Sequence, residues 1–155
     1  MEELQVPTHR IDVEVFITSG AEIHGSLYAH ESPYHSGNPE DVIHLLNDER
    51  VFLPLCVEGR AAGPYVVNKT HIVRVHLPIS EVDRQDRLST APIDVEDCTL
   101  FLSNGTTLTG MLSIETPTNS SRLVDKLNFA DGFVPVYTGD GIDFVRKSHV
   151  VHVSS

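Results

Sequence analysis

Two short turns in this 155-residue chain place a lysine next to a histidine. They are Lys69-Thr70-His71 and Lys147-Ser148-His149, and each one lies between two runs of apolar, β-branched residues. A fixed cation beside an imidazole could bind an anion or make a contact that depends on pH. The simpler interpretation, which we favour, is that each histidine bonds a backbone carbonyl or caps its turn.

The other residues that could do chemistry form no recognisable set. The chain has nine histidines and two cysteines, but no nucleophile elbow, phosphate-binding loop, zinc-ligand spacing or dinucleotide fingerprint. Cys56 and Cys98 are too few for a disulfide framework or a cysteine-rich zinc site. Asp125 lies three residues after Arg122, as in an ordinary ion pair on a helix. We therefore expect no catalytic residues, no metal and no cofactor.

The two Lys-Thr/Ser-His turns belong to a longer internal repeat. The segment 13–27 matches 98–112, 40–55 matches 121–136, and 66–75 matches 144–153, in the same order and with an offset that drifts only from 85 to 78. Matches in three ordered blocks indicate a tandem duplication. We predict one repeat over 9–77, a linker over 78–93 and a second repeat over 94–155.

Each repeat shows the pattern of a small β domain. Val13 to Thr18 and Glu22 to Ala29 predict two strands around a Gly turn, and Asn104-Gly105 gives the stronger form of that turn in the second repeat. Apolar residues at helical spacing follow over 39–46 and 121–127, and three further short strands end the unit. The predicted fold is mainly β, with two strongly bent, barrel-like, five-stranded units that each carry a short helix. Ser80 and Asp83 have capping-box spacing and predict a helical turn in the linker.

This pattern resembles the Sm-like fold of Sm and LSm proteins and of the bacterial host-factor RNA chaperone. The run Phe16-x3-Gly20-x4-Gly25-x-Leu27 and its counterpart Phe101-x3-Gly105-x4-Gly110-x-Leu112 carry the likeness. The segment Arg122 to Phe129, followed by Gly-Phe-Val-Pro-Val, is similar to a group of small bacterial Sm-like domains of uncharacterised function. The resemblance implies small bent sheets that associate edge to edge, often into rings.

The residues with which Sm proteins bind RNA are not intact in this chain. Asn47 and Asn128 stand near the family's Asn position, but Leu45 and Lys126 replace the aromatic residue two positions earlier. The Lys-Thr/Ser-His turns stand where the family has Arg-Gly. The resemblance therefore implies the fold without implying RNA binding. The residues that could still contribute to a binding site are Asn47, Lys69, His71, Asn128, Arg146, Lys147 and His149.

Charge then ranks the possible functions. The formal net charge is −11, and nucleic-acid affinity depends on Lys and Arg that neutralise phosphates. We favour a non-catalytic interaction or scaffold module that binds a protein partner or itself through its sheet edges. The first alternative is an RNA-binding assembly with a local patch of Lys69, Arg74, Arg146 and Lys147. The second is a small-molecule site between the repeats that uses the His-rich insertion 31–39.

The sequence also favours a location away from membranes. No apolar run approaches the length of a membrane span, and the first ten residues lack the pattern of a signal peptide. The low cysteine content fits a reducing compartment. We therefore expect a cytoplasmic, soluble protein.

Overall fold

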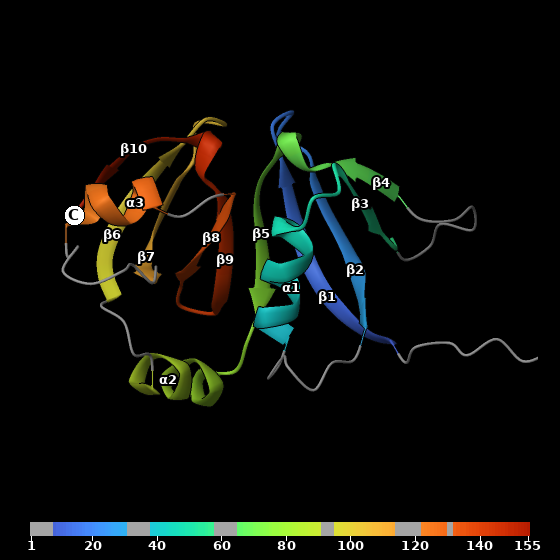
Figure 1. The fold of residues 1–155 in the computed structure, drawn as a ribbon, viewed down its shortest axis with the longest axis horizontal. Helices are drawn as coiled ribbons and strands as arrows, with labels where there is room; N and C mark the ends of the chain where they lie inside the picture. The colour runs from blue at the N-terminus through green and yellow to red at the C-terminus, as the bar shows by residue number, and fades with distance from the viewer. Residues whose placement is uncertain (1–7, 31–37, 58–64, 91–94, 114–121, 130–131) are drawn as a thin grey trace, which may run out of the picture.

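The computed structural model describes residues 8–30, 38–57, 65–90, 95–113, 122–129 and 132–155, which form antiparallel strands and three helices (Figure 1). The first half contains β1 (Thr8–Ile17), β2 (Glu22–His30), α1 (Asn38–Asn47), β3 (Phe52–Leu55), β4 (Tyr65–Asn68) and β5 (Ile72–Pro78). After α2 (Glu81–Thr90), the second half contains β6 (Val95–Leu102), β7 (Thr107–Ser113), α3 (Leu123–Phe129), β8 (Phe133–Tyr137), β9 (Gly141–Arg146) and β10 (Val150–Ser154). The order of elements is the predicted one in both halves.

Four glycines shape the first two strands of each half. Gly20 and Gly105 have φ of 90° and 85°, a conformation that favours glycine, so they close the β1–β2 and β6–β7 turns. Gly25 and Gly110 lie within β2 and β7, where the next strand approaches closely. A Cβ would lie 2.7 Å from Leu55 at Gly25 and 2.5 Å from a backbone oxygen at Gly110. The mid-strand glycines thus serve packing of the sheet.

Both halves pair their strands in the same order. The first half runs β5-β1-β2 and continues through a single bridge from Ser26 to Cys56 into the β3–β4 pair. The second half runs β10-β6-β7-β8-β9. The register shift between β1 and β5 at Phe16/Ile17 recurs between β6 and β10 at Val150/His152. The matching blocks of sequence therefore have matching backbone pairings.

The two halves do not form two separate barrels. The outer edge of β5 pairs with the outer edge of β9, so one open eight-stranded antiparallel sheet runs through the boundary in the order β10-β6-β7-β8-β9-β5-β1-β2. Figure 1 shows β5 and β9 side by side at the centre, with β10 and the β3–β4 pair at opposite ends. The prediction of a mainly β fold is confirmed. The described strands contain no closed barrel, because β5 and β9 join the halves edge to edge.

Two hydrophobic cores lie on the sheet, and each receives side chains from the other half. The first core contains buried residues of β1, β2, α1, β3 and β5, together with Phe133, Ile142 and Phe144 from the second half. The second core contains residues of β6, β7, β8 and β9, together with Val73 from β5. Exchange of these side chains makes the halves depend on each other for burial of apolar surface.

The segment between the halves is more ordered than the sequence indicated. Pro78 is the last residue of β5, and a ten-residue helix, α2, occupies most of the predicted linker. The Ser80 hydroxyl accepts a hydrogen bond from the backbone N–H of Asp83 at 3.1 Å, as the capping spacing predicts. Arg87 of α2 donates to Glu40 at 2.7 Å and so ties the helix to α1.

Candidate interaction edges

The pairing of β5 with β9 forms an internal seam between the halves. Its register places Arg74 opposite Val145, Val75 opposite Phe144, and His76 opposite Asp143. A strand edge that is not paired exposes backbone N–H and C=O groups, and such an edge readily accepts another strand. The internal seam therefore uses one edge of each half.

A buried ionic cluster lies in the internal seam. The Asp143 carboxylate, 2% exposed, accepts hydrogen bonds from Arg74 of β5 and, at 3.0 Å, from the Thr138 hydroxyl. His76 Nδ1 lies 3.0 Å from Asp143 Oδ2, the same oxygen that accepts the hydrogen bond from Thr138. This hydrogen bond to Asp143 raises the pKa of His76 against the opposing effect of burial. Arg74 also stacks 3.7 Å from the ring centre of Phe16.

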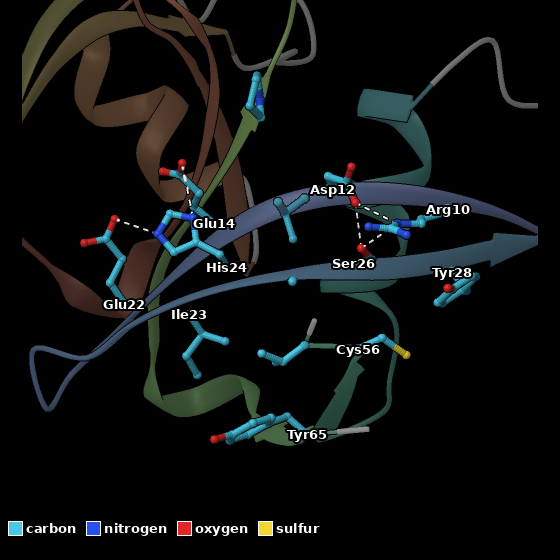
Figure 2. Close-up of a pocket in the computed structure, with 14 residues that line it drawn as sticks. Arg10, Asp12, Glu14, Glu22, Ile23, His24, Ser26, Tyr28, Cys56 and Tyr65 are labelled. Atoms are coloured by element: carbon cyan, nitrogen blue, oxygen red, sulfur yellow. Dashed lines mark hydrogen bonds and ion pairs between the residues drawn. The ribbon is translucent and has the colours of Figure 1, made fainter. Parts of the chain in front are cut away.

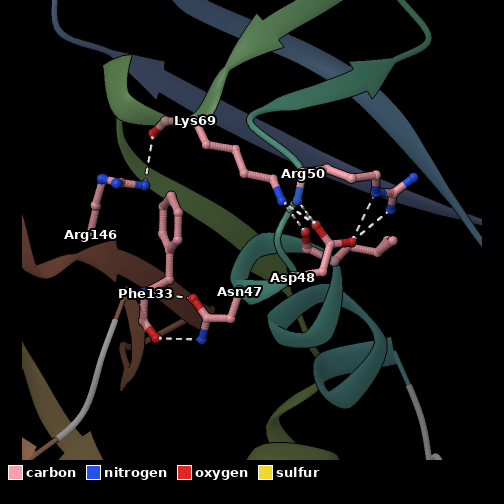
Figure 3. A network of polar contacts seen from close by, with 7 residues as sticks. Asn47, Asp48, Arg50, Lys69, Phe133 and Arg146 are labelled. Carbon is pink, nitrogen blue, oxygen red and sulfur yellow. Dashed lines mark hydrogen bonds and ion pairs between the residues drawn. The ribbon is translucent and has the colours of Figure 1, made fainter.

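A second polar contact crosses the same seam at the end of α1 (Figure 3). The Asn47 side chain accepts a hydrogen bond from the Phe133 backbone N–H at 2.7 Å and donates one to its C=O at 3.0 Å. Gly132, which precedes Phe133, has φ of 69°, and a Cβ there would overlap Asn47 Oδ1. The absence of a side chain at Gly132 lets the amide reach the backbone of β8.

Lys69 is buried beside this contact, and its charge is paired with that of Asp48. Its ammonium group donates to the Leu45 carbonyl at 2.7 Å and to Asp48 Oδ1 at 2.6 Å. Burial raises the pKa of Asp48, but hydrogen bonds from Arg50 and Lys69 more than offset it and leave the pKa well below its usual range. Arg146 donates to the Lys69 carbonyl at 3.3 Å and to Ser148 at 3.0 Å. Lys69 and Arg146, two of the candidate binding residues, therefore make contacts within the chain at the seam.

Each histidine of the two Lys-Thr/Ser-His turns contacts a hydroxyl in a neighbouring turn, and His149 also bonds a backbone carbonyl, as the simpler interpretation expects. His71 Nδ1 lies 3.2 Å from the Thr18 hydroxyl, and His149 Nδ1 lies 2.9 Å from the Ser103 hydroxyl. His149 Nε2 also donates to the Thr70 carbonyl of the first half at 2.6 Å. The structure thus brings Asn47, Lys69, Arg146 and His149 together at the seam, and it places His71 in the adjoining turn.

The remaining two predicted residues, Asn128 and Lys147, lie in the second half. Asn128 is exposed at the end of α3. Lys147 is half-buried in a single 3-10 turn that ends at His149. Phe129 stands at the sequence position equivalent to Asp48, so the second half has no carboxylate there to pair with the lysine. Equivalent residues of the two halves therefore have different surroundings.

Two strand edges equivalent to those in the seam have no neighbour among the described residues. They are the outer edges of β4, equivalent to β9, and of β10, equivalent to β5, and we call them the open edges. Val73 and Phe144 in the seam are 0% and 1% exposed, whereas their equivalents Val151 and Val66 are 66% and 60% exposed. Phe133 is 2% exposed and its equivalent Phe52 is 51% exposed. The open edges therefore display apolar side chains that the seam buries.

A cavity of about 720 Å³ opens beside β1 and β2 (Figure 2). On one side Ser26 donates to Asp12 at 2.6 Å and Arg10 donates to the same oxygen at 2.9 Å. These two hydrogen bonds hold the pKa of Asp12 below its ordinary value. His24 stands between Glu14 and Glu22, 3.6 and 3.5 Å away. The charged side chains that line this cavity contact one another or Ser26.

A smaller cavity of about 270 Å³ lies at the seam, between Asn47, Lys69, Gly132 and Arg146. Its lining is the polar network shown in Figure 3. Within the described part of the chain, no group of three or more His, Cys, Asp or Glu could hold a metal ion. The His-rich insertion lies largely in 31–37, outside the described residues.

Sequence reasoning found the turns at the seam but missed its charged centre. Arg74 entered only as part of a possible basic patch, and His76 and Asp143 were not selected. A signal was present, because an Asp between Ile142 and Phe144 interrupts an apolar strand, and Tyr65 replaces it in the other repeat. A polar residue that is present in only one of two matching strands can mark a contact that only this strand makes.

Comparison with known proteins adds no relative. No protein-family model, curated protein or solved structure matches the chain. None of the described helices is long and apolar enough to span a membrane.

Proposed function

We propose that the protein is a non-catalytic interaction module of Sm-like fold that associates with further copies of itself through its open edges. The observation that carries the proposal is the contrast in exposure between equivalent side chains. Val66 and Val151 are largely exposed on the open edges, whereas Phe144 and Val73 are buried where two such edges meet. Apolar side chains on an unpaired strand favour addition of another strand.

The local strand order also supports an Sm-like interpretation. Each half places its last strand beside its first, and then continues through the second, third and fourth strands. The resemblance implies this bent arrangement and its association edge to edge. A tandem pair joined through β5 and β9 leaves one edge of each kind open, and a chain with two open edges can act as a scaffold.

The surroundings of the basic residues favour this function over RNA binding. Arg74 is paired with Asp143, and Lys69 with Asp48, so these cations are not available to phosphates. Arg146 donates to a backbone carbonyl and to Ser148. Binding of nucleic acid would also have to overcome the net charge of −11.

Sedimentation velocity at increasing protein concentration tests the proposal. We expect wild-type protein to form concentration-dependent oligomers and the double variant Val66→Lys/Val151→Lys to remain monomeric. Each lysine would place a charge where the seam buries an apolar side chain. Val82→Lys is the matched control, because Val82 is 73% exposed on α2 and belongs to neither open edge.

Two results would contradict the proposal. A wild-type protein that stays monomeric at every concentration would exclude self-association as its function. Oligomers that form equally well in the double variant would show that association uses another surface. Thermal unfolding of both variants at the same temperature as wild type would confirm that they fold.

A further inference from the structure

We infer that copies of this chain associate head to tail, with β10 of one copy adding antiparallel to β4 of the next and repeating the geometry of the internal seam. The inference rests on the proposed function and adds to it the polarity, the register and the side chains that cross between copies. The internal seam supplies the template, because it joins one β5-type edge to one β9-type edge.

The register of the intermolecular pairing follows from the equivalent positions. In the seam, Arg74 lies opposite Val145, Val75 opposite Phe144, and His76 opposite Asp143. The third block of the repeat has an offset of 78 residues. Applying that offset to the three pairs places His152 opposite Val67, Val153 opposite Val66, and Ser154 opposite Tyr65 of the next copy.

Exchange of core residues gives this polarity its driving force. Phe133 and Phe144 of the second half pack into the first core, and Val73 of β5 packs into the second core. By the same geometry, Phe52 and Val66 of one copy would enter the second core of the preceding copy. Val151 would enter the first core of the following copy. These three exposed side chains would thereby become buried.

The state of the second core fits a missing neighbour. The first core, which receives Phe133, Ile142 and Phe144 through the seam, has sixteen buried residues, and the second has eight of those described. Val153 is only partly buried against the second core, whereas its equivalent Val75 is 0% exposed in the first. A following copy would bring two large side chains to this place.

The intermolecular contact should be weaker than the internal seam. His152, Ser154 and Tyr65 stand where the seam has Arg74, His76 and Asp143, so the buried ionic cluster is absent. Val51 stands where the seam has Gly132, and a Cβ at that position conflicts with the contact that Asn47 makes. Association through the open edges should therefore be reversible and depend on concentration, unlike the seam within the chain.

Mixing two singly blocked variants tests the polarity. Val66→Lys blocks the β4 edge and Val151→Lys blocks the β10 edge. Head-to-tail pairing predicts that each variant alone is monomeric, since every contact needs one edge of each kind. An equimolar mixture should give a heterodimer and nothing larger, because each chain keeps one usable edge. The sedimentation coefficient of the mixture reports this directly.

A pair of cysteines tests the register. In a Cys56→Ser background, a Val66→Cys chain mixed with a Val153→Cys chain should form a disulfide-linked heterodimer under mild oxidation. The control mixes Val66→Cys with Glu96→Cys, a position of β6 outside both open edges, and should give at least tenfold less cross-linked product.

The outcomes separate this inference from the proposed function. Wild-type protein that never associates would overturn both. Wild-type oligomers together with dimers of either single variant alone would preserve self-association and overturn the polarity, since like edges would then be pairing. A mixture that stays monomeric, or cross-linking no better than the control, would also overturn the inference while leaving association of the wild type intact.

Discussion

The internal seam and the open edges are built from equivalent strands but differ in what surrounds them. In the seam, Phe133 is 2% exposed and Asp143 forms a buried cluster with Arg74. Beside the open edge of β4, Phe52 of β3 is 51% exposed, and Tyr65 of β4 replaces the aspartate. The comparison separates two roles of one strand geometry. Both places have apolar residues at equivalent positions, whereas the buried ionic cluster is present in the seam alone.

The largest expected difference in stability is between Phe133→Ala in the seam and Phe52→Ala beside the open edge. Phe133→Ala should lower the free energy of unfolding by about 4 kcal/mol, because the side chain is buried in the first core. Phe52→Ala, at the equivalent position, should lower it by about 0.5 kcal/mol in the monomer. Urea denaturation measures both values, and similar losses would contradict the difference between seam and open edge.

Removing the carboxylate at the centre of the seam should cost slightly less. Asp143→Ala leaves Arg74 and His76 without their shared partner in a buried place, a change expected to cost about 3 kcal/mol. Asp140→Ala is the matched control, because Asp140 is 84% exposed and lies 3.6 Å from His76. Chemical denaturation of both variants gives the comparison, and equal stability would exclude a structural role for the cluster.

Local features of the fold could be predicted from the sequence because local residues determine them. Gly20 and Gly105 marked turns, alternation marked strands, and Ser80 marked the start of a helix. The continuous sheet could not be predicted in this way. Both repeats carry apolar residues at the edge positions, as in Val73 and Val151, so hydrophobic pattern alone does not say which edge finds a neighbour within the chain.

The candidate site residues make contacts that the sequence did not indicate. Asn47 and Lys69 came from their place in an RNA-binding family, yet they make contacts within the chain at the seam. The repeat itself could have corrected this, because Gly132 next to the clamped backbone is Val51 in the first repeat. A position at which the two halves carry different residues can therefore mark a contact that only one half makes. A position with the same residue in both halves gives no such information.

The two equivalent asparagines, Asn47 and Asn128, should differ in their contribution to stability by an intermediate amount. Asn47→Ala removes both hydrogen bonds to the Phe133 backbone and should lower the free energy of unfolding by about 1.5 kcal/mol. Asn128→Ala, at the equivalent exposed position, should change it by less than about 0.5 kcal/mol. Thermal and urea unfolding of the pair provide the test, and a larger loss at Asn128 would reverse the expected order.

Transfer of the ionic pair to the open edges should strengthen association between copies. The double variant His152→Arg/Tyr65→Asp would copy Arg74 and Asp143, and Phe101, which stacks on His152 at 4.0 Å, would support the arginine as Phe16 supports Arg74. We expect a dissociation constant about tenfold lower than that of wild type. Each single variant should show no such gain, and a gain with Arg alone would point to general charge attraction.

The smallest expected effect depends on pH and comes from His76. Its pKa is raised in the folded protein, because Asp143 accepts its hydrogen bond and Asp143, Asp140 and Glu14 add negative charge, while burial opposes them. A raised folded-state pKa gives stability that is complete below the unfolded value of about 6.5 and disappears as pH rises through the folded value. The loss of unfolding free energy in His76→Gln should therefore be larger at about pH 6 than at about pH 8.5. His24→Gln, an exposed histidine outside the seam, is the control. A loss that does not change with pH would mean that His76 stabilises the seam as a neutral hydrogen-bond donor, leaving Arg74 as the only cation that Asp143 requires.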